Sequence, residues 1–154
     1  GENLAFGLRQ HTNTKEEEIH KIVAEKLHAV GLDGIEEMMP NDLSGGMKKR
    51  VSLARAVALN PKIILYDEPT AGLDPVRSND ISRLIKAMQE SMHPLSVVVT
   101  HDMESAFSVA DRMVYLENGR FEMIGTTEEF KNTTNEKVRY FITGGKEGRE
   151  GGER

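Results

Sequence analysis

A short apolar run that ends in two acids constrains this sequence more than any other feature. Lys62 to Tyr66 has the sequence KIILY, and Asp67, Glu68 and Pro69 follow it at once. A brief apolar run of this kind is typical of a strand buried in a parallel sheet. The carboxyl ends of such strands form the edge at which α/β sheets bind ligands, so both acids are expected there. Taken alone, the pattern also fits a strand that ends in a solvated acidic turn.

The second half of the chain alternates expected strands with expected helices. Further strands are predicted over Leu95 to Thr100, Arg112 to Leu116 and Arg120 to Ile124, the last two joined by the hairpin signal Asn118-Gly119. Helices are predicted after the N-cap Asp74, with Pro75 at the first helical position, and over Met103 to Val109, Thr127 to Lys131 and Glu136 to Ile142. This order predicts an α/β fold with a mostly parallel sheet.

The first 60 residues are expected to be largely helical. Ile19 to Val30 has apolar residues at helical spacing, with a capping-box pattern at Thr14 and Glu17 before it and Gly31 after it. A second helix is expected from Ser44. We therefore predict a helical subdomain over residues 1–60, the C-terminal part of an α/β core over 61–143, and a disordered tail over 144–154. The tail holds only glycine and charged residues and cannot bury apolar surface.

The composition excludes several classes of protein. The 154 residues are 38% hydrophobic and 29% charged, which is the balance of a globular chain. A formal net charge of −5 argues against a general nucleic-acid-binding surface. The absence of cysteine excludes disulfides, thiolate zinc sites and cysteine nucleophiles. The apolar runs are far shorter than the roughly 20 residues that cross a bilayer.

Several further segments carry residues that bear on a possible phosphate site. Ser44-Gly45-Gly46 begins a helix, where exposed N–H groups favour an anion and glycine lets it approach closely, although a capped helix start is the plainer interpretation. His101 follows a strand and would lie at the same sheet edge as Glu68, although a lone histidine there is more often structural. Asp74 fits a simple N-cap. The basic run from Lys48 to Arg50 fits a solvated helix face or a source of positive potential beside the phosphate site.

These segments occur as LSGGM, ILYDEP, AGLD and VVVTHD, in that order, within about 60 residues. Together they resemble the ATP-binding subunits of ABC transporters, in which they are the signature motif, the Walker B strand, the D-loop and the switch-histidine segment. The resemblance extends from Gly1 to about Gly144. It implies a P-loop NTPase (RecA-like) core with a parallel sheet, an ABC α-helical subdomain that ends in the signature motif and its helix, and ATP and Mg²⁺ as ligands.

The resemblance also implies roles within one subunit. Asp67 would hold Mg²⁺ beside the phosphates. Glu68 would be the general base that positions and deprotonates the attacking water. His101 would contact the γ-phosphate.

Other roles implied by the resemblance involve a second ATPase subunit. Ser44, Gly45 and Gly46 would contact the γ-phosphate of ATP held mainly by the other subunit of a homodimer. Asp74 would cross the dimer interface and couple the two sites. Met47 departs from the glutamine that many family members have there, so any polar contact by that side chain is lost.

One family element is absent from the sequence. The P-loop pattern GxxxxGK[ST] does not occur, and the adenine-stacking aromatic residue and the Q-loop belong to the same preceding segment of the family. A member that has lost ATP binding is a poorer explanation than an N-terminally truncated chain, because Ser44, Asp67, Glu68 and His101 are all present. We expect such a fragment to be inactive alone. In the family's strand order the missing strand would leave two strand edges unpaired, so we also expect the fragment to aggregate.

Longer runs, including MMPNDLSGGMKKRVSLARA and YDEPTAGLDPVRSNDI, are similar to the ATPases of Mla-type (MCE-associated) phospholipid transporters. This similarity implies phospholipid transport for the outer membrane, with an integral-membrane permease and an MCE-type lipid-binding protein as partners. It implies a cytoplasmic location, peripheral on the inner face of the inner membrane. The alternatives are an amino-acid-type importer ATPase and a non-transport ABC ATPase that acts on nucleic acid or ribosomes. The net charge of −5 and the lack of a basic arm disfavour nucleic acid as a partner.

Overall fold

The computed structural model describes residues 1–145, and these form parts of two compact units that divide after His101. Each unit is described by itself below. The predicted disordered tail lies outside the described residues from position 146 onward, while Gly144 and Gly145 form a turn.

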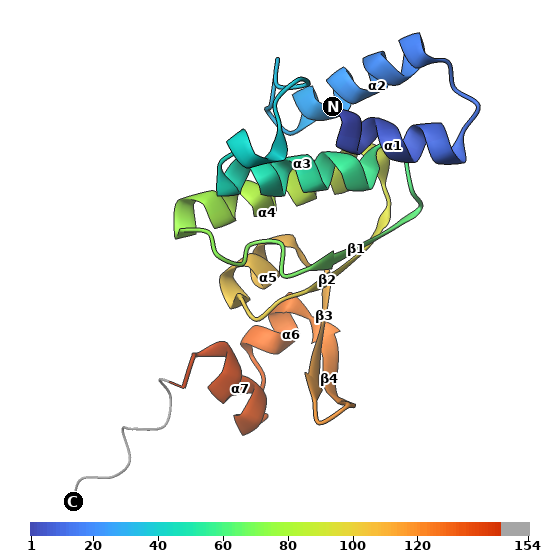
Figure 1. The fold of residues 1–154 in the computed structure, drawn as a ribbon. Helices are drawn as coiled ribbons and strands as arrows, with labels where there is room; N and C mark the ends of the chain where they lie inside the picture. The colour runs from blue at the N-terminus through green and yellow to red at the C-terminus, as the bar shows by residue number, and fades with distance from the viewer. Residues whose placement is uncertain (146–154) are drawn as a thin grey trace, which may run out of the picture. The chain divides into compact units, whose positions relative to one another are not determined.

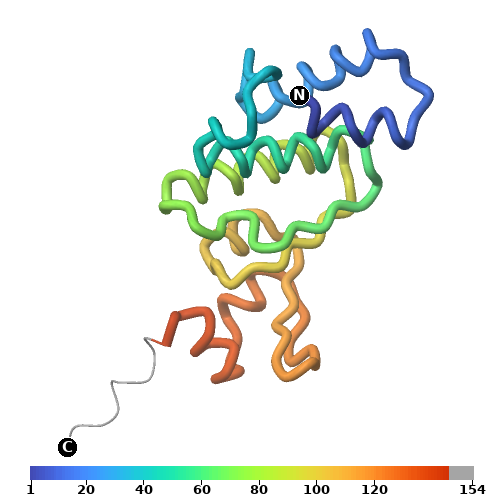
Figure 2. The backbone as a smooth tube through the Cα atoms, viewed as in Figure 1, coloured from blue at the N-terminus to red at the C-terminus, as the bar shows by residue number. Residues whose placement is uncertain are grey.

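The first unit, Gly1–His101, combines helices with one pair of strands (Figure 1). Its elements are α1 (Glu2–His11), α2 (Glu16–Ala29), the short 3₁₀ helix η1 (Pro40–Asp42), α3 (Gly45–Val57), β1 (Ile63–Asp67), α4 (Pro75–Met92) and β2 (Leu95–Val99). Figure 2 shows α3 running beside α4, and α3 also packs against α1 and α2. This helix therefore lies at the centre of the unit.

One hydrophobic core joins the helices of this unit to its sheet. Ile64 and Tyr66 of β1 are buried in the same cluster as Leu53 and Val57 of α3 and Ile81 of α4. The predicted boundary at residue 60 marks a change in secondary structure, whereas the division by contacts falls after His101 because the core continues across residue 60.

The strands β1 and β2 are parallel and in register, with Ile63 opposite Leu95 and Asp67 opposite Val99. Alternate side chains of β1 point into the helical core, and the others are exposed. The exposed apolar side chains on the two strands are Ile63, Leu65, Leu95, Val97 and Val99. One face of this sheet is therefore apolar and open, although parallel sheets normally bury both faces.

Local signals account for most of the helix ends. Ser44 is the N-cap of α3, and Asp74 is the N-cap of α4 with Pro75 at its first position, as predicted. Gly31, at φ +69°, follows the end of α2 in the left-handed conformation that glycine adopts easily, which agrees with its predicted place.

The first segment contains one helix that was not predicted and one predicted cap that does not form. The helix α1 was not expected, because its polar residues mask a short buried stripe of Leu4, Ala5 and Leu8. The predicted capping box at Thr14 does not form. Thr14 instead lies in a turn in which the Thr12 hydroxyl donates to the Thr14 hydroxyl oxygen at 2.8 Å, and α2 begins after Lys15 without a side-chain cap.

The second unit begins at Asp102 and surrounds a β-hairpin. Its elements are α5 (Met103–Val109), β3 (Arg112–Glu117), β4 (Arg120–Thr126), α6 (Thr127–Lys131) and α7 (Glu136–Ile142). The two strands are antiparallel, and Asn118 and Gly119 both have positive φ in the turn between them, as the hairpin signal predicted. A small core of Ala106, Met113, Phe130 and Val138 holds the unit together.

The predicted α/β fold class is confirmed, but the described strands form two separate two-stranded sheets. Within residues 1–145, β1 pairs with β2 alone and β3 pairs with β4 alone. The described strands thus make one parallel and one antiparallel pair where a mostly parallel sheet was predicted. None of the helices in this part of the chain is long and apolar enough to traverse a membrane.

Candidate active site

The centre of the candidate site is Glu68, which directly follows β1. Its backbone has φ +45°, a left-handed conformation that is uncommon for a residue other than glycine. The Glu68 N–H donates to the carbonyl of Val99 at 2.9 Å, and the Glu68 carbonyl accepts from the N–H of Ala71 at 3.2 Å. The parallel pairing of β1 with β2 therefore continues through Glu68 and turns its side chain toward the residues that follow β2.

Thr100 and His101, which follow β2, hold the Glu68 carboxylate. One carboxylate oxygen accepts from the His101 N–H at 3.1 Å and lies 2.8 Å from the His101 Nδ1. The other lies 3.3 Å from the Thr100 hydroxyl, which donates to it. The hydrogen bond with His101 is the main cause that lowers the pKa of Glu68 from its ordinary value. The lowered pKa keeps this carboxylate ionised but makes it a weaker base, so its fixed orientation is the feature that suits it to receive a proton from a water molecule.

Two of the predicted catalytic residues, Glu68 and His101, are thus in direct contact. The His101 side chain is 76% exposed and the Glu68 side chain 33%, so both can be reached from solvent. Thr100 was not singled out from the sequence as a site residue. Its place immediately before His101 in VVVTHD is the signal that could have identified it.

Asp67 is the last residue of β1, and it is exposed beside Glu68. No group of three or more histidine, aspartate or glutamate side chains suited to a metal occurs in the described part of the chain. A single carboxylate nevertheless fits Mg²⁺, because this ion commonly binds through one or two carboxylates, substrate phosphates and several waters. The donor chemistry at this sheet edge is therefore compatible with the predicted ion.

The predicted signature residues form the start of α3. The Ser44 hydroxyl oxygen accepts from the Met47 N–H at 3.3 Å, which is an N-cap contact. A Cβ atom at Gly45 would meet no atom within 4 Å, and one at Gly46 would meet only the Arg77 side chain at 3.8 Å. Packing within this chain therefore does not require glycine at either position, which leaves the helix start open to a ligand or partner.

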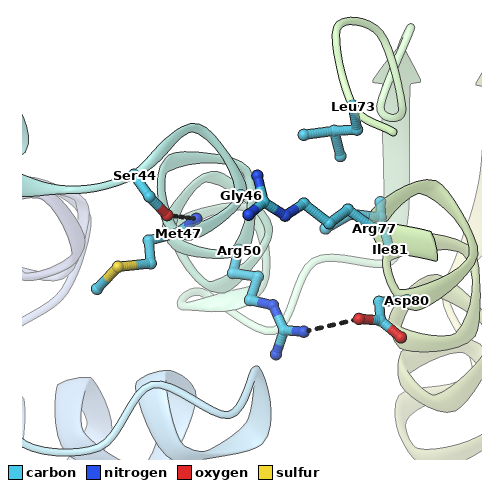
Figure 3. A pocket seen from close by; sticks show the side chains of 8 residues that line it. All are labelled: Ser44, Gly46, Met47, Arg50, Leu73, Arg77, Asp80 and Ile81. Atoms are coloured by element: carbon cyan, nitrogen blue, oxygen red, sulfur yellow. Dashed lines mark hydrogen bonds and ion pairs between the residues drawn. The ribbon is translucent and has the colours of Figure 1, made fainter. Parts of the chain in front are cut away.

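A pocket of about 190 Å³ lies between the first turns of α3 and α4 (Figure 3). Arg50 reaches across it toward Asp80, with 3.6 Å between the charged atoms, and also donates to the carbonyl of Val30 at 2.9 Å. The pocket is lined by Ser44, Gly46, Met47, Arg50, Leu73, Arg77, Asp80 and Ile81. The structure thus brings two predicted site residues, Ser44 and Gly46, together with two arginines.

Asp74 has a structural role within this chain. Its carboxylate accepts from the Arg77 N–H at 3.0 Å and lies 3.3 Å from the Arg77 Nε, so it caps α4 and pairs with a residue one turn on. Arg77 and Asp80 were not identified from the sequence, because nothing local distinguishes them from other charged residues of an exposed helix face.

Comparison with known proteins shows which family this chain resembles. The profile of the family described as ABC transporter matches residues 2–71, which contain the signature residues, Asp67 and Glu68. The intermembrane phospholipid transport system ATP-binding protein MlaF of Haemophilus influenzae is 41% identical over 147 residues, covering 96% of this chain and 56% of MlaF. The chain is therefore similar to ABC transporter ATP-binding proteins, and its residues 2–71 match their family model.

Two further comparisons support the same resemblance. The probable ribonucleotide transport ATP-binding protein mkl of Mycobacterium leprae is 45% identical over 143 residues, covering 93% of the chain and 41% of mkl. The dimeric post-hydrolysis structure of the ATP-binding cassette MJ0796, bound to ADP and Pi, has a TM-score of 0.71 and 36% identity, and covers 82% of the chain and 55% of MJ0796. The predicted ABC ATPase fold is thereby confirmed. The chain spans about half the length of the curated relatives that it matches.

Proposed function

We propose that this chain is the part of an ABC transporter ATPase that carries the general base and the signature motif. The observation that carries the proposal is the fixed carboxylate of Glu68, held by Thr100 and by both the backbone and the ring of His101. A further support is that Glu68 follows the carboxyl end of a parallel strand pair, the edge at which α/β sheets commonly bind ligands.

In the proposed reaction, Glu68 takes a proton from a water molecule as that water attacks the γ-phosphorus of ATP. A bond forms between the water oxygen and phosphorus, and the bond from phosphorus to the oxygen shared with the β-phosphate breaks, which gives ADP and inorganic phosphate. His101 keeps the base oriented, and its exposed ring can meet the phosphate. Asp67 would hold Mg²⁺, which neutralises charge on the phosphates when bound.

The chain would act as part of a longer ATP-binding protein, called the complete protein below. The support is that the sequence lacks a P-loop and that the matched relatives are about twice as long. The P-loop supplies most of the contacts to nucleotide phosphates in this class of enzyme. We therefore expect the 154-residue chain alone to be inactive.

The signature residues would act on a second copy of the complete protein. The open surroundings of Gly45 and Gly46 support a contact made from outside this chain, and the solved relative MJ0796 is a dimer. In a homodimer, Ser44 and the N–H groups that follow it would meet the γ-phosphate of ATP held by the other subunit. Asp74 would lie at the subunit interface while it caps α4.

The cargo we propose is phospholipid. The support is the similarity to MlaF, whose name describes an intermembrane phospholipid transport system, over nearly the whole chain. The partners would then be an integral-membrane permease and an MCE-type lipid-binding protein, with the ATPase on the cytoplasmic face of the inner membrane. Co-purification of the complete protein with a permease, and ATP hydrolysis stimulated by phospholipid in the reconstituted complex, would support this cargo. Stimulation by amino acids alone would contradict it.

The general-base role is tested by Glu68→Gln in the complete protein. We expect ATP binding to persist and hydrolysis to fall by about 10²- to 10⁴-fold, the usual contribution of a general base. The matched control is Glu25→Gln, which alters an exposed carboxylate on α2 and should leave hydrolysis unchanged. Unchanged hydrolysis in Glu68→Gln would overturn the role given to Glu68.

A further inference from the structure

The backbone of Glu68 is held in a conformation that its sequence context does not favour. Its φ of +45° lies in the left-handed region, and Pro69 follows it. A residue before proline is ordinarily pushed to an extended conformation by the proline ring. Such a backbone persists only where the surrounding structure fixes it.

One of the groups that fix the Glu68 backbone comes from α3, which begins at the predicted signature motif and is called the signature helix below. The Lys49 Nζ donates to the Glu68 carbonyl at 3.2 Å, across 19 positions of sequence. The same carbonyl also accepts from the Ala71 N–H within its own turn. Lys49 and Glu68 are both half-buried, so this contact is partly shielded from water.

Lys49 bonds to the backbone carbonyl of Glu68, and the Glu68 carboxylate bonds to His101. The ammonium group is paired with a carbonyl oxygen, while the carboxylate oxygens meet His101 and Thr100. Lys49 thus helps to fix the backbone of Glu68, and His101 helps to fix its carboxylate. The sequence pattern alone gave Lys49 no such role, because it lies in a basic run that fits a solvated helix face.

We propose that Lys49 is a positioning residue that couples the signature helix α3 to the general base of the same subunit. This rests on the proposed function, in which Ser44 and Gly46 at the start of α3 meet ATP held by the partner subunit. Lys49 lies little more than one helical turn after Ser44 on the same rigid helix. A shift of α3 on meeting that ATP is transmitted through Lys49 to the carbonyl of Glu68, and so to the direction of its carboxylate.

The test uses steady-state ATP hydrolysis by the complete protein. Lys49→Met removes the donor and keeps most of the stem, and we expect kcat to fall by about tenfold to a hundredfold, the range given by losing a charged hydrogen bond. The KM for ATP should stay within about twofold, because the contact does not touch the nucleotide. Lys49→Arg should recover most of the rate. The control Arg55→Met, at an exposed position on the same helix, should match the parent.

A second measurement separates positioning from a merely structural role. If Lys49 acts through Glu68, then Lys49→Met should cause no further loss of rate in a Glu68→Gln background. An additive loss in the double variant, an unchanged kcat in Lys49→Met, or a parallel fall in thermal midpoint and ATP affinity would each overturn the proposal. Failure of the proposed function has a different signature, since Glu68→Gln by itself would then retain hydrolysis.

Discussion

The open apolar face of the β1–β2 sheet leads to a prediction about the complete protein. Leu65 is 76% exposed there, whereas its neighbour Ile64, on the opposite face, is only 4% exposed. Parallel strands are normally covered on both faces. Since the chain spans about half the length of its curated relatives, we expect a segment of the complete protein outside this chain to cover Leu65.

The magnitude follows from the exposed fraction. Burying a whole leucine, isoleucine or valine side chain stabilises by about 1.5–3 kcal/mol, so covering side chains that are already partly buried adds about 1–2 kcal/mol each. Five such residues would contribute on the order of 5–10 kcal/mol, which is comparable to the total stability of a domain. If the face is covered, Leu65→Ala should destabilise the complete protein by about 2–4 kcal/mol.

The assay is urea unfolding of the complete protein, with the midpoint and slope measured for each variant. Ile64→Ala should be destabilising by about 2–5 kcal/mol whether or not the other face is covered. Val76→Ala, at a position 73% exposed on α4, should stay within about 0.5 kcal/mol of the parent. If Leu65→Ala in the complete protein behaves like Val76→Ala, the reasoning about a covering segment is refuted.

Three further predictions concern the second unit, each measured in the complete protein. Phe130→Ala should reduce stability by about 3–5 kcal/mol, because Phe130 is buried in the small core, and an unchanged urea midpoint would contradict that core. Gly119→Val should be destabilising by about 1 kcal/mol or more, since the turn holds position 119 at φ +74°, whereas Gly45→Ala should not cause comparable unfolding. The Thr126 N–H lowers the pKa of Glu129 by donating to its carboxylate, so this capping contact stabilises the fold above the ordinary glutamate pKa and is lost as pH falls through the lowered value. Glu129→Gln should flatten the dependence of the urea midpoint on pH below the ordinary glutamate pKa, and an unaltered curve would argue against this contribution.

Much of the fold could be predicted because its signals are local. The ends of α5, α6 and α7 agree with the sequence prediction, and the turn at Asn118-Gly119 follows from the residues that tolerate positive φ. The N-caps Ser44 and Asp74 could likewise be predicted, because the side chain of an N-cap accepts a hydrogen bond from an N–H only three residues away. α1 was missed because its stripe of three buried residues is too short to produce clear periodicity.

In the candidate site, too, some features could be predicted from the sequence and others depend on packing. The sequence predicted that Glu68 and His101 lie at the same sheet edge, but their 2.8 Å contact depends on the register that sets Asp67 opposite Val99. The contact from Lys49 depends on where α3 packs, which no spacing in the sequence encodes.

The sequence by itself determined the N-caps Ser44 and Asp74, the ends of α5, α6 and α7 and the runs that form strands, because these follow from the properties of residues close together in the chain. The phosphate chemistry of Asp67, Glu68 and His101 stays a prediction from their motifs. Only the tertiary structure decided that Glu68 has a left-handed backbone and that a lysine of the signature helix bonds to its carbonyl. It also decided which face of β1 lies open. The physical reason is that these features join segments 19 or more positions apart, where packing and strand register set the geometry.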